Sequence, residues 1–249
     1  MTLNCRAVFF DLSGVLYDGD RLIPNAVETV YAVRDQGMTL RFVTNTATRS
    51  AGCILSKLER FGIPLVAEEL FTAPLAAKAY AEAKSLRPYL IVHPEIRPLF
   101  DDLEQDDPNC VLLGDAREGL NYEAMNQAFQ YCHNGAELLA IGCNKYFSQD
   151  GRLQLDSGAY VKALEWASGQ TACILGKPGK AFFEQVVAST PFAANECLMI
   201  GDDLQGDVIG ALNAGMQAAL VRTGKFSSDD EKHLPKSARI LNSVADLLD

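Results

Sequence analysis

The segment on which the fold depends reads Ala7-Val8-Phe9-Phe10-Asp11-Leu12-Ser13-Gly14-Val15-Leu16. Its apolar beginning is typical of a buried β-strand, and it ends abruptly on an acid, a small hydroxyl residue and a glycine. A carboxylate at the end of a buried strand is costly to desolvate unless a cation or hydrogen bonds compensate it. Asp11 therefore either opens a turn or caps a helix, or it is a nucleophile held in an open α/β sheet.

The size and composition are those of an ordinary soluble globular protein. The chain has 249 residues, 48% of them hydrophobic and 22% charged, which suits one large domain or two modest ones. The net charge of −10 argues against nucleic acid or an anionic membrane as the main partner. No run reaches the length of a membrane span, and the first residues lack a signal-peptide core.

The cysteines are odd in number, scattered and without a C-x-x-C pair. This usage indicates reduced thiols that pack inside a cytoplasmic protein. The three histidines show no ligand spacing, so we expect no zinc site.

Strand-like and helix-like segments alternate at both ends of the chain, which predicts a parallel sheet covered on both faces. We expect strands at 6–10, 38–43, 171–175, 197–200 and 217–221. We expect helices at 25–34, 49–61, 68–84, 181–188 and 205–214. Asn25 is the expected cap of the first helix.

The middle of the chain has a βαβ-rich pattern of its own, with a turn at Asp150-Gly151. We interpret it as an inserted domain, with a core in two parts at 1–80 and 173–249 and the insertion at 81–172. Within the insertion, residues 144–146 follow a predicted strand. They either face the functional site or form an ordinary surface turn.

Polar signatures follow four predicted core strands, namely Asp11-Leu12-Ser13, Thr44-Asn45, Lys177-Pro178 and Gly201-Asp202-Asp203 with Asp207. Ligands of open parallel sheets bind beyond the carboxyl ends of the strands, so we expect these signatures to converge. Each has a plainer reading when taken alone, as a turn, a loop or a helix cap. Their occurrence together and in this order indicates phosphoryl transfer.

Each part has a chemical use in that reaction. Asp11 can attack phosphorus and form an aspartyl phosphate. A hard cation such as Mg²⁺ can bridge the Asp11 and Asp202 carboxylates and the phosphate oxygens. Lys177 supplies a compact positive charge, and Thr44 can hydrogen-bond the phosphoryl oxygens.

These motifs resemble those of the haloacid dehalogenase superfamily, in its class IIA branch, over essentially all 249 residues. The resemblance implies an α/β fold with a Rossmannoid parallel-sheet core and a large inserted cap domain of class C2. It also implies a Mg²⁺-dependent phosphohydrolase with a small phosphorylated substrate. Residues 199–208 and 221–226 are similar to a narrower group. It contains phosphatases for pyrophosphate, phospholysine and phosphohistidine and the related haloacid-dehalogenase-like hydrolase domain-containing proteins. An exposed cap edge is compatible with a homodimer, as in relatives.

The resemblance further implies a role for each motif residue. Asp11 is the nucleophile and a Mg²⁺ ligand, and Ser13 lends the metal its backbone carbonyl. Asp202 is the remaining protein ligand, with Asp203 and Asp207 supporting it from outside the coordination shell. The residues that bind the phosphoryl group are Thr44, Asn45 and Lys177, and Lys177 neutralises it.

Position 13 departs from the family pattern. Most phosphatases of the superfamily carry an aspartate there, which protonates the leaving group and then activates water. Losing such an acid/base typically costs about 10²–10⁴-fold in rate. With Ser13, either the substrate needs little help at its leaving group, as pyrophosphate and P–N compounds do, or the protein is a weak or inactive member with a binding or regulatory role. A P-loop protein is disfavoured because Gly176-Lys177 and Gly224-Lys225 lack the required glycine spacing.

Overall fold

The computed structural model describes residues 4–149 and 152–248, so the predicted turn at Asp150-Gly151 lies outside the described residues. The chain divides into two compact units. Unit 1 consists of Met1–Thr44, Ala51–Phe71 and Lys177–Asp249, and unit 2 consists of Asn45–Ser50 and Thr72–Gly176. None of the helices in the described ranges is long and apolar enough to cross a membrane.

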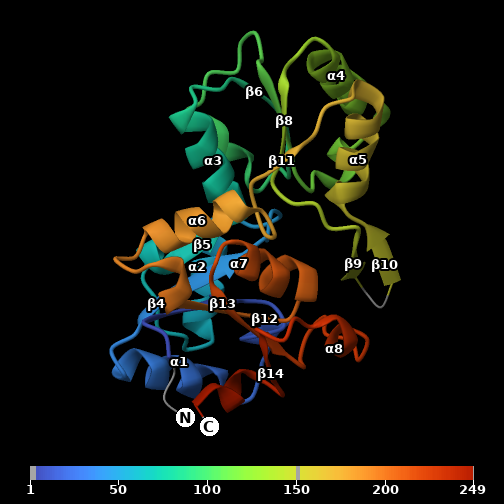
Figure 1. The fold of residues 1–249 in the computed structure, drawn as a ribbon. Coiled ribbons are helices and arrows are strands. Elements are labelled where there is room, and N and C mark those ends of the chain that lie inside the picture. The colour runs from blue at the N-terminus through green and yellow to red at the C-terminus, as the bar shows by residue number, and fades with distance from the viewer. Residues whose placement is uncertain (1–3, 150–151, 249) are drawn as a thin grey trace. The chain divides into compact units, whose positions relative to one another are not determined.

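Unit 1 contains a sheet whose strands are β1 (Ala7–Asp11), β4 (Thr39–Thr44), β5 (Leu70–Thr72), β12 (Cys197–Gly201), β13 (Gln217–Val221) and β14 (Arg239–Leu241). Their spatial order is β14-β13-β12-β1-β4-β5 (Figure 1). The β1 ladders with β12 and β4 are both parallel. Every residue of β1 is buried, because the strand is central and covered on both faces.

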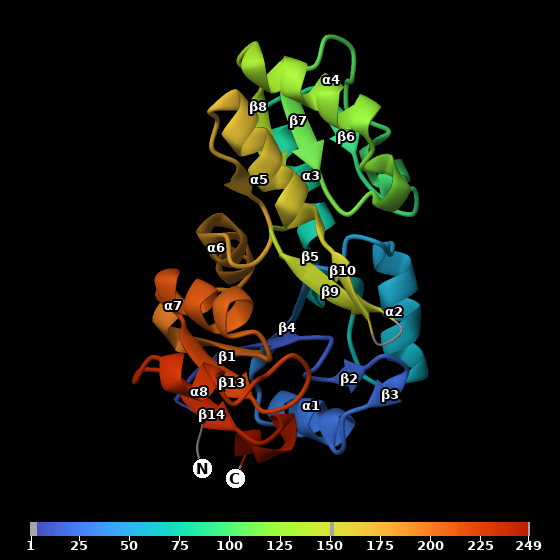
Figure 2. The same ribbon diagram turned by 90° about the vertical axis from the view of Figure 1, so that its right-hand side faces the viewer.

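The helices of unit 1 are α1 (Ala26–Asp35), α2 (Ala51–Arg60), α6 (Lys180–Ala188), α7 (Gly210–Asn213) and α8 (Asp230–His233). Apolar residues of α1 and α2 join one buried cluster with Val8 and Phe10 of β1. Helices α6 and α7 lie on the opposite face of the sheet (Figure 2). A short hairpin of β2 (Tyr17–Asp18) and β3 (Arg21–Leu22) follows β1. The core is therefore the expected Rossmannoid α/β layer structure.

Unit 2 has a parallel sheet of its own, with the strand order β11-β8-β7-β6. Its strands are β6 (Pro88–Ile91), β7 (Cys110–Leu113), β8 (Glu137–Ala140) and β11 (Cys173–Ile174). Helix α3 (Ala73–Ala83) packs on one face, and α4 (Tyr122–His133) and α5 (Ser157–Ser168) pack on the other (Figure 1). An antiparallel hairpin joins β9 (Tyr146–Gln149) to β10 (Arg152–Leu155).

The segment predicted as one helix at 68–84 is a strand followed by a helix. Strand β5 extends the sheet of unit 1, and Thr72 then caps α3 by accepting a hydrogen bond from Leu75 N at 3.3 Å. The alanine face of α3 packs against apolar residues of β7 and β8, so α3 belongs to unit 2. The division between the units therefore falls at 71/72 and 176/177, whereas the sequence analysis placed the domain boundaries at 80/81 and 172/173.

Two helix predictions differ in detail from the structure. Asn25 adopts a left-handed conformation with φ of 60° and makes no side-chain cap, so its predicted capping role is wrong. The predicted helix at 205–214 begins as a π-helical segment, Leu204–Ile209, which continues into α7. Such wide turns occur often at functional sites, where they reposition a side chain.

Candidate active site

The site residues predicted for unit 1 gather at the carboxyl edge of its sheet. Asp11 ends β1, Thr44 ends β4, and Asp202 directly follows β12. All three are buried, with 7%, 3% and 2% of their surface exposed. Ser13 is exposed in the loop after β1. Because β12, β1 and β4 are adjacent parallel strands, residues far apart in the sequence meet at one edge.

Three carboxylates crowd together at this edge. Asp11, Asp202 and Asp207 each offer an oxygen, and these oxygens lie within 4.8 Å of one another. Burial, followed by the charges of Asp11 and Asp207, raises the pKa of Asp202 to about 8. Burial raises the pKa of Asp207 to about 6, although Lys177 opposes the shift. Carboxylates so close together resist full ionisation unless a cation joins them.

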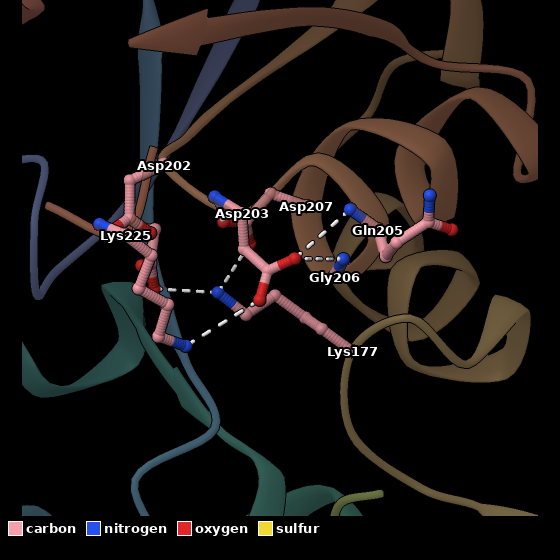
Figure 3. A network of polar contacts seen from close by, with 8 residues as sticks. Lys177, Asp202, Asp203, Gln205, Gly206, Asp207 and Lys225 are labelled. Atoms are coloured by element: carbon pink, nitrogen blue, oxygen red, sulfur yellow. Dashed lines mark hydrogen bonds and ion pairs between the residues drawn. The ribbon is translucent and has the colours of Figure 1, made fainter. Parts of the chain in front are cut away.

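Lys177 lies between two of these acids (Figure 3). Its Nζ is 2.6 Å from Asp11 Oδ1 and 2.5 Å from Asp207 Oδ1, and its side chain is 5% exposed. Burial disfavours the ammonium, but Asp11 and Asp207 outweigh it and raise the pKa of Lys177 above its ordinary value. Lys177 is therefore a fixed positive charge beside Asp11.

Asp203 and Asp207 take different positions. Asp203 Oδ1 accepts hydrogen bonds from Gln205 N at 3.0 Å and Gly206 N at 2.8 Å, so this residue caps the π-helical segment (Figure 3). Asp207, one turn later, is 1% exposed and lies in the carboxylate cluster. Its Oδ2 accepts from Asp203 N at 3.2 Å, which fixes the carboxylate beside Lys177. Of the Asp202-Asp203 pair, Asp203 is thus the residue that caps the helix, and Asp202 is not.

A loop that the sequence analysis did not assign to the site holds Asp202 in place. Lys225 N donates to Asp202 Oδ2 at 2.7 Å, and Thr223 Oγ1 donates to the Gly14 carbonyl at 2.5 Å. A Cβ atom on Gly14 or Gly224 would lie 1.9 or 2.0 Å from Asp202 Oδ2, so only glycine fits at either position. The loop follows β13, and the strand-end rule could therefore have identified it.

The donor set fits a hard divalent cation. Carboxylate oxygens are the ligands that Mg²⁺ prefers, and oxygens of three buried aspartates lie within 4.8 Å of one another here. Asp207 uses both oxygens, for Lys177 and for the Asp203 N–H. Asp11 and Asp202 each use one oxygen in the contacts described above, which leaves the other oxygen of each for a cation.

The remaining predicted residues belong to unit 2 or adjoin it. Asn45 begins a short segment of unit 2, where its Oδ1 lies 2.7 Å from the position that a Cβ on Gly176 would occupy. Its contact with a phosphoryl group remains a prediction. Lys145 and Tyr146 line a pocket of unit 2 together with residues of β10 and α5.

Comparison with protein families shows two matches that span both parts of the core. Residues 8–105 match the model described as haloacid dehalogenase-like hydrolase, and residues 174–247 match a model described as HAD-hydrolase-like. The matched residues include Asp11, Lys177 and Asp202. The prediction that Lys177 follows a strand of the core sheet is wrong, because the strand before it, β11, pairs with β8 in the sheet of unit 2.

Curated relatives are similar along nearly the whole chain. Phospholysine phosphohistidine inorganic pyrophosphate phosphatase of Xenopus laevis is 40% identical, with 98% of this chain and 93% of the relative covered. Haloacid dehalogenase-like hydrolase domain-containing protein 2 of Bos taurus is 39% identical, with 91% and 87% covered.

Solved structures share the fold. The p-nitrophenyl phosphatase from Archaeoglobus fulgidus matches with a TM-score of 0.90 at 23% identity, over 99% of both chains. The 4-nitrophenylphosphatase from Thermotoga maritima matches with a TM-score of 0.89 at 21% identity, over 98% of this chain and 96% of that one.

Proposed function

Because the chain belongs to the haloacid dehalogenase superfamily of hydrolases, we propose that this enzyme is a Mg²⁺-dependent phosphohydrolase that acts through an aspartyl phosphate. The observation that carries the proposal is the position of Asp11. Its carboxylate ends a central strand, lies 2.6 Å from the Lys177 ammonium and shares a cluster with Asp202. A buried acid held in this way is suited to nucleophilic attack on phosphorus.

In the first step, an Asp11 oxygen attacks phosphorus, and the bond to the leaving group breaks with its electron pair on that group. Lys177 neutralises charge on the phosphoryl oxygens, and Thr44 and neighbouring backbone N–H groups hydrogen-bond them. Water then attacks the aspartyl phosphate, which releases phosphate and restores the Asp11 carboxylate. Asp11, Asp202 and the Ser13 carbonyl would hold Mg²⁺, with Asp203 and Asp207 in support. When bound, the ion supplies Lewis-acid polarisation of the phosphoryl group.

The substrate is small and phosphorylated, and Ser13 limits which leaving groups the enzyme can release efficiently. A serine hydroxyl does not titrate in the working range, so position 13 provides no general acid. Pyrophosphate releases phosphate, which leaves readily, and the nitrogen of a P–N bond can be protonated before cleavage. The name of the 40% identical Xenopus laevis relative contains both substrate classes. We therefore propose pyrophosphate or P–N compounds as substrates of this cytoplasmic enzyme, with unit 2 as its cap.

A second candidate is a weakly active or inactive family member with a binding or regulatory role. The exposed Ser13 in place of an acid favours it. The two candidates differ in turnover of pyrophosphate, phosphoramidate and p-nitrophenyl phosphate, measured with Mg²⁺ and with a chelator.

The Asp11→Asn variant tests the nucleophile. We expect turnover of every substrate to fall at least about 10³-fold, because an amide cannot form the phosphoenzyme. The Asp20→Asn variant is the matched control, since that exposed acid lies outside the site. Residual activity of Asp11→Asn near the wild-type level would refute the assignment. Absence of Mg²⁺-dependent turnover in the wild type would favour the binding protein.

A further inference from the structure

The loop Thr223–Lys225 places one more residue at the edge of the site. Three contacts anchor the loop. The Thr223 hydroxyl donates a hydrogen bond to the Gly14 carbonyl, and the Lys225 N–H donates one to the Asp202 carboxylate. Gly224 also packs closely against Gly14, since a Cβ on Gly224 would be 2.5 Å from Gly14 Cα. All three involve backbone atoms or a side chain other than that of Lys225. The backbone of Lys225 is therefore held beside Asp202 whatever its side chain does.

The Lys225 ammonium differs from that of Lys177 in its exposure. The Lys177 side chain is 5% exposed and contacts two acids at short distances. The Lys225 side chain is 62% exposed, and its Nζ lies 3.6 Å from Asp203 Oδ2 (Figure 3). Water and dissolved ions screen an exposed ion pair of this kind, so it is weak. An anion from solution can therefore compete for the Lys225 ammonium much more easily than for that of Lys177.

The ion-pair partner of Lys225 is held in place on the protein side. Asp203 itself is fixed, because its Oδ1 accepts two backbone N–H groups. Lys225 thus carries an exposed ammonium on a backbone that is anchored next to the carboxylate cluster.

Taking the proposed phosphohydrolase function as its basis, we propose that Lys225 is a specificity residue that binds the second, non-transferred phosphate of an inorganic diphosphate. Lys177 and the proposed cation site balance the negative charge of the transferred phosphoryl group. A second phosphate brings additional negative charge, and Lys225 offers an exposed ammonium anchored beside Asp202. Attack at one phosphorus breaks the bridging P–O bond, and its electron pair leaves with the phosphate held by Lys225. Charge develops on that phosphate, so the ammonium stabilises it without a proton from position 13.

The same residue acts in the opposite direction on P–N substrates. When the P–N bond breaks, its electron pair leaves with the amine, which departs neutral; before that step, the protonated nitrogen of the bound substrate is positively charged. A fixed ammonium next to it is unfavourable by like-charge repulsion. Lys225 therefore favours the binding of diphosphates over that of protonated P–N substrates at the same site.

The Lys225→Met variant removes the charge and keeps the length of the side chain, and the backbone N–H on Asp202 survives. At constant free Mg²⁺, we expect KM for pyrophosphate to rise about 10-fold, the effect of one lost charge-assisted hydrogen bond. KM for p-nitrophenyl phosphate, which has no second phosphate, is expected to change less than about twofold. KM for phosphoramidate is expected to stay equal or fall. Lys225→Arg restores pyrophosphate binding, and Lys232→Met, at an exposed lysine paired with Asp229, is the matched control.

A binding measurement decides the question independently of turnover. Calorimetric titration of wild type and Lys225→Met with imidodiphosphate and with orthophosphate, both in Mg²⁺, compares two phosphates with one. We expect Kd for imidodiphosphate to rise about 10-fold in the variant and Kd for orthophosphate to change less than about twofold. An equal loss for both ligands, or no loss for either, overturns the role of Lys225. A wild type that binds these ligands but turns over no substrate refutes the proposed function instead.

Discussion

Ser13 is the residue at which this chain departs most from the chemistry of its superfamily. It lies exposed between buried Leu12 and Gly14, directly after the strand that ends in Asp11. The backbone there needs no change to carry a longer side chain toward solvent. At this position the site has a hydroxyl group in place of a general acid.

The Ser13→Asp variant therefore tests whether proton transfer limits the enzyme. We expect kcat/KM for an alkyl phosphate such as glycerol 2-phosphate to rise about 10²-fold, because its alkoxide leaving group needs a proton. Pyrophosphate, whose leaving group needs none, is expected to gain much less. Ser13→Asn has nearly the same shape without a titratable group and controls for the change in size. An unchanged rate on the alkyl phosphate would show that a missing acid is not the limit.

At the scale of elements, the site depends on two loops that touch. The loop after β1 and the loop after β13 meet at Gly14 and Gly224, and the Asp202 carboxylate lies against both. Each glycine has a left-handed backbone, with φ of +84° for Gly14 and +64° for Gly224. The contact therefore requires glycine twice over, for conformation and for space.

The requirement for space can be separated from the requirement for conformation by comparing alanine substitutions at two glycines, Gly224 and Gly19. In Gly224→Ala the new Cβ would lie 2.0 Å from Asp202 Oδ2, so we expect the carboxylate to move and Mg²⁺ affinity to fall about 10-fold or more. Gly19→Ala is the matched control, because Gly19 also has a positive φ, +53°, but nothing lies within 4 Å of its Cβ position. Both variants carry backbone strain of about 1 kcal/mol. Mg²⁺ titration followed by calorimetry distinguishes them, and equal affinities would contradict the role of the contact.

At the scale of the whole molecule, the carboxylate cluster links stability to pH and to metal. In the metal-free protein the pKa of Asp202 is raised to about 8, mainly by burial. An aspartate in an unfolded chain titrates near about 3.9, so between these values the folded state binds more protons than the unfolded state. The free energy of unfolding of the metal-free protein therefore falls as pH rises through this window.

Thermal unfolding with a chelator checks this linkage. We expect the wild-type Tm to be several degrees lower at pH 8.5 than at pH 5.5, and Asp202→Asn to reduce that difference, since the amide has no proton to lose. Mg²⁺ is expected to raise the wild-type Tm most at pH 8.5, because it then binds ionised carboxylates. The same pH slope in wild type and variant would contradict the assignment to Asp202.

Chain order and residue type alone determined the core of the site. A buried run that ends in Asp11, and later strands that end in Thr44 and Asp202, predict convergence because parallel strands share a carboxyl edge. This rule depends only on the direction of the chain, so it survives errors in helix bounds such as that at 205–214.

Tertiary structure decided which side chains complete the site and where the units divide. Asp203 and Asp207 are the same residue type and cannot be told apart in the sequence. The π-helical turn makes Asp203 a helix cap and brings Asp207 into contact with Lys177. The strand-end rule places the Lys225 loop at the same edge, but only the tertiary structure shows that Gly224 meets Gly14 and that Lys225 N binds Asp202. Likewise, α3 belongs to unit 2 because its alanine face packs against β7 and β8. Periodicity predicts which face of an element is buried, but the surface that buries it is supplied by residues distant in the chain.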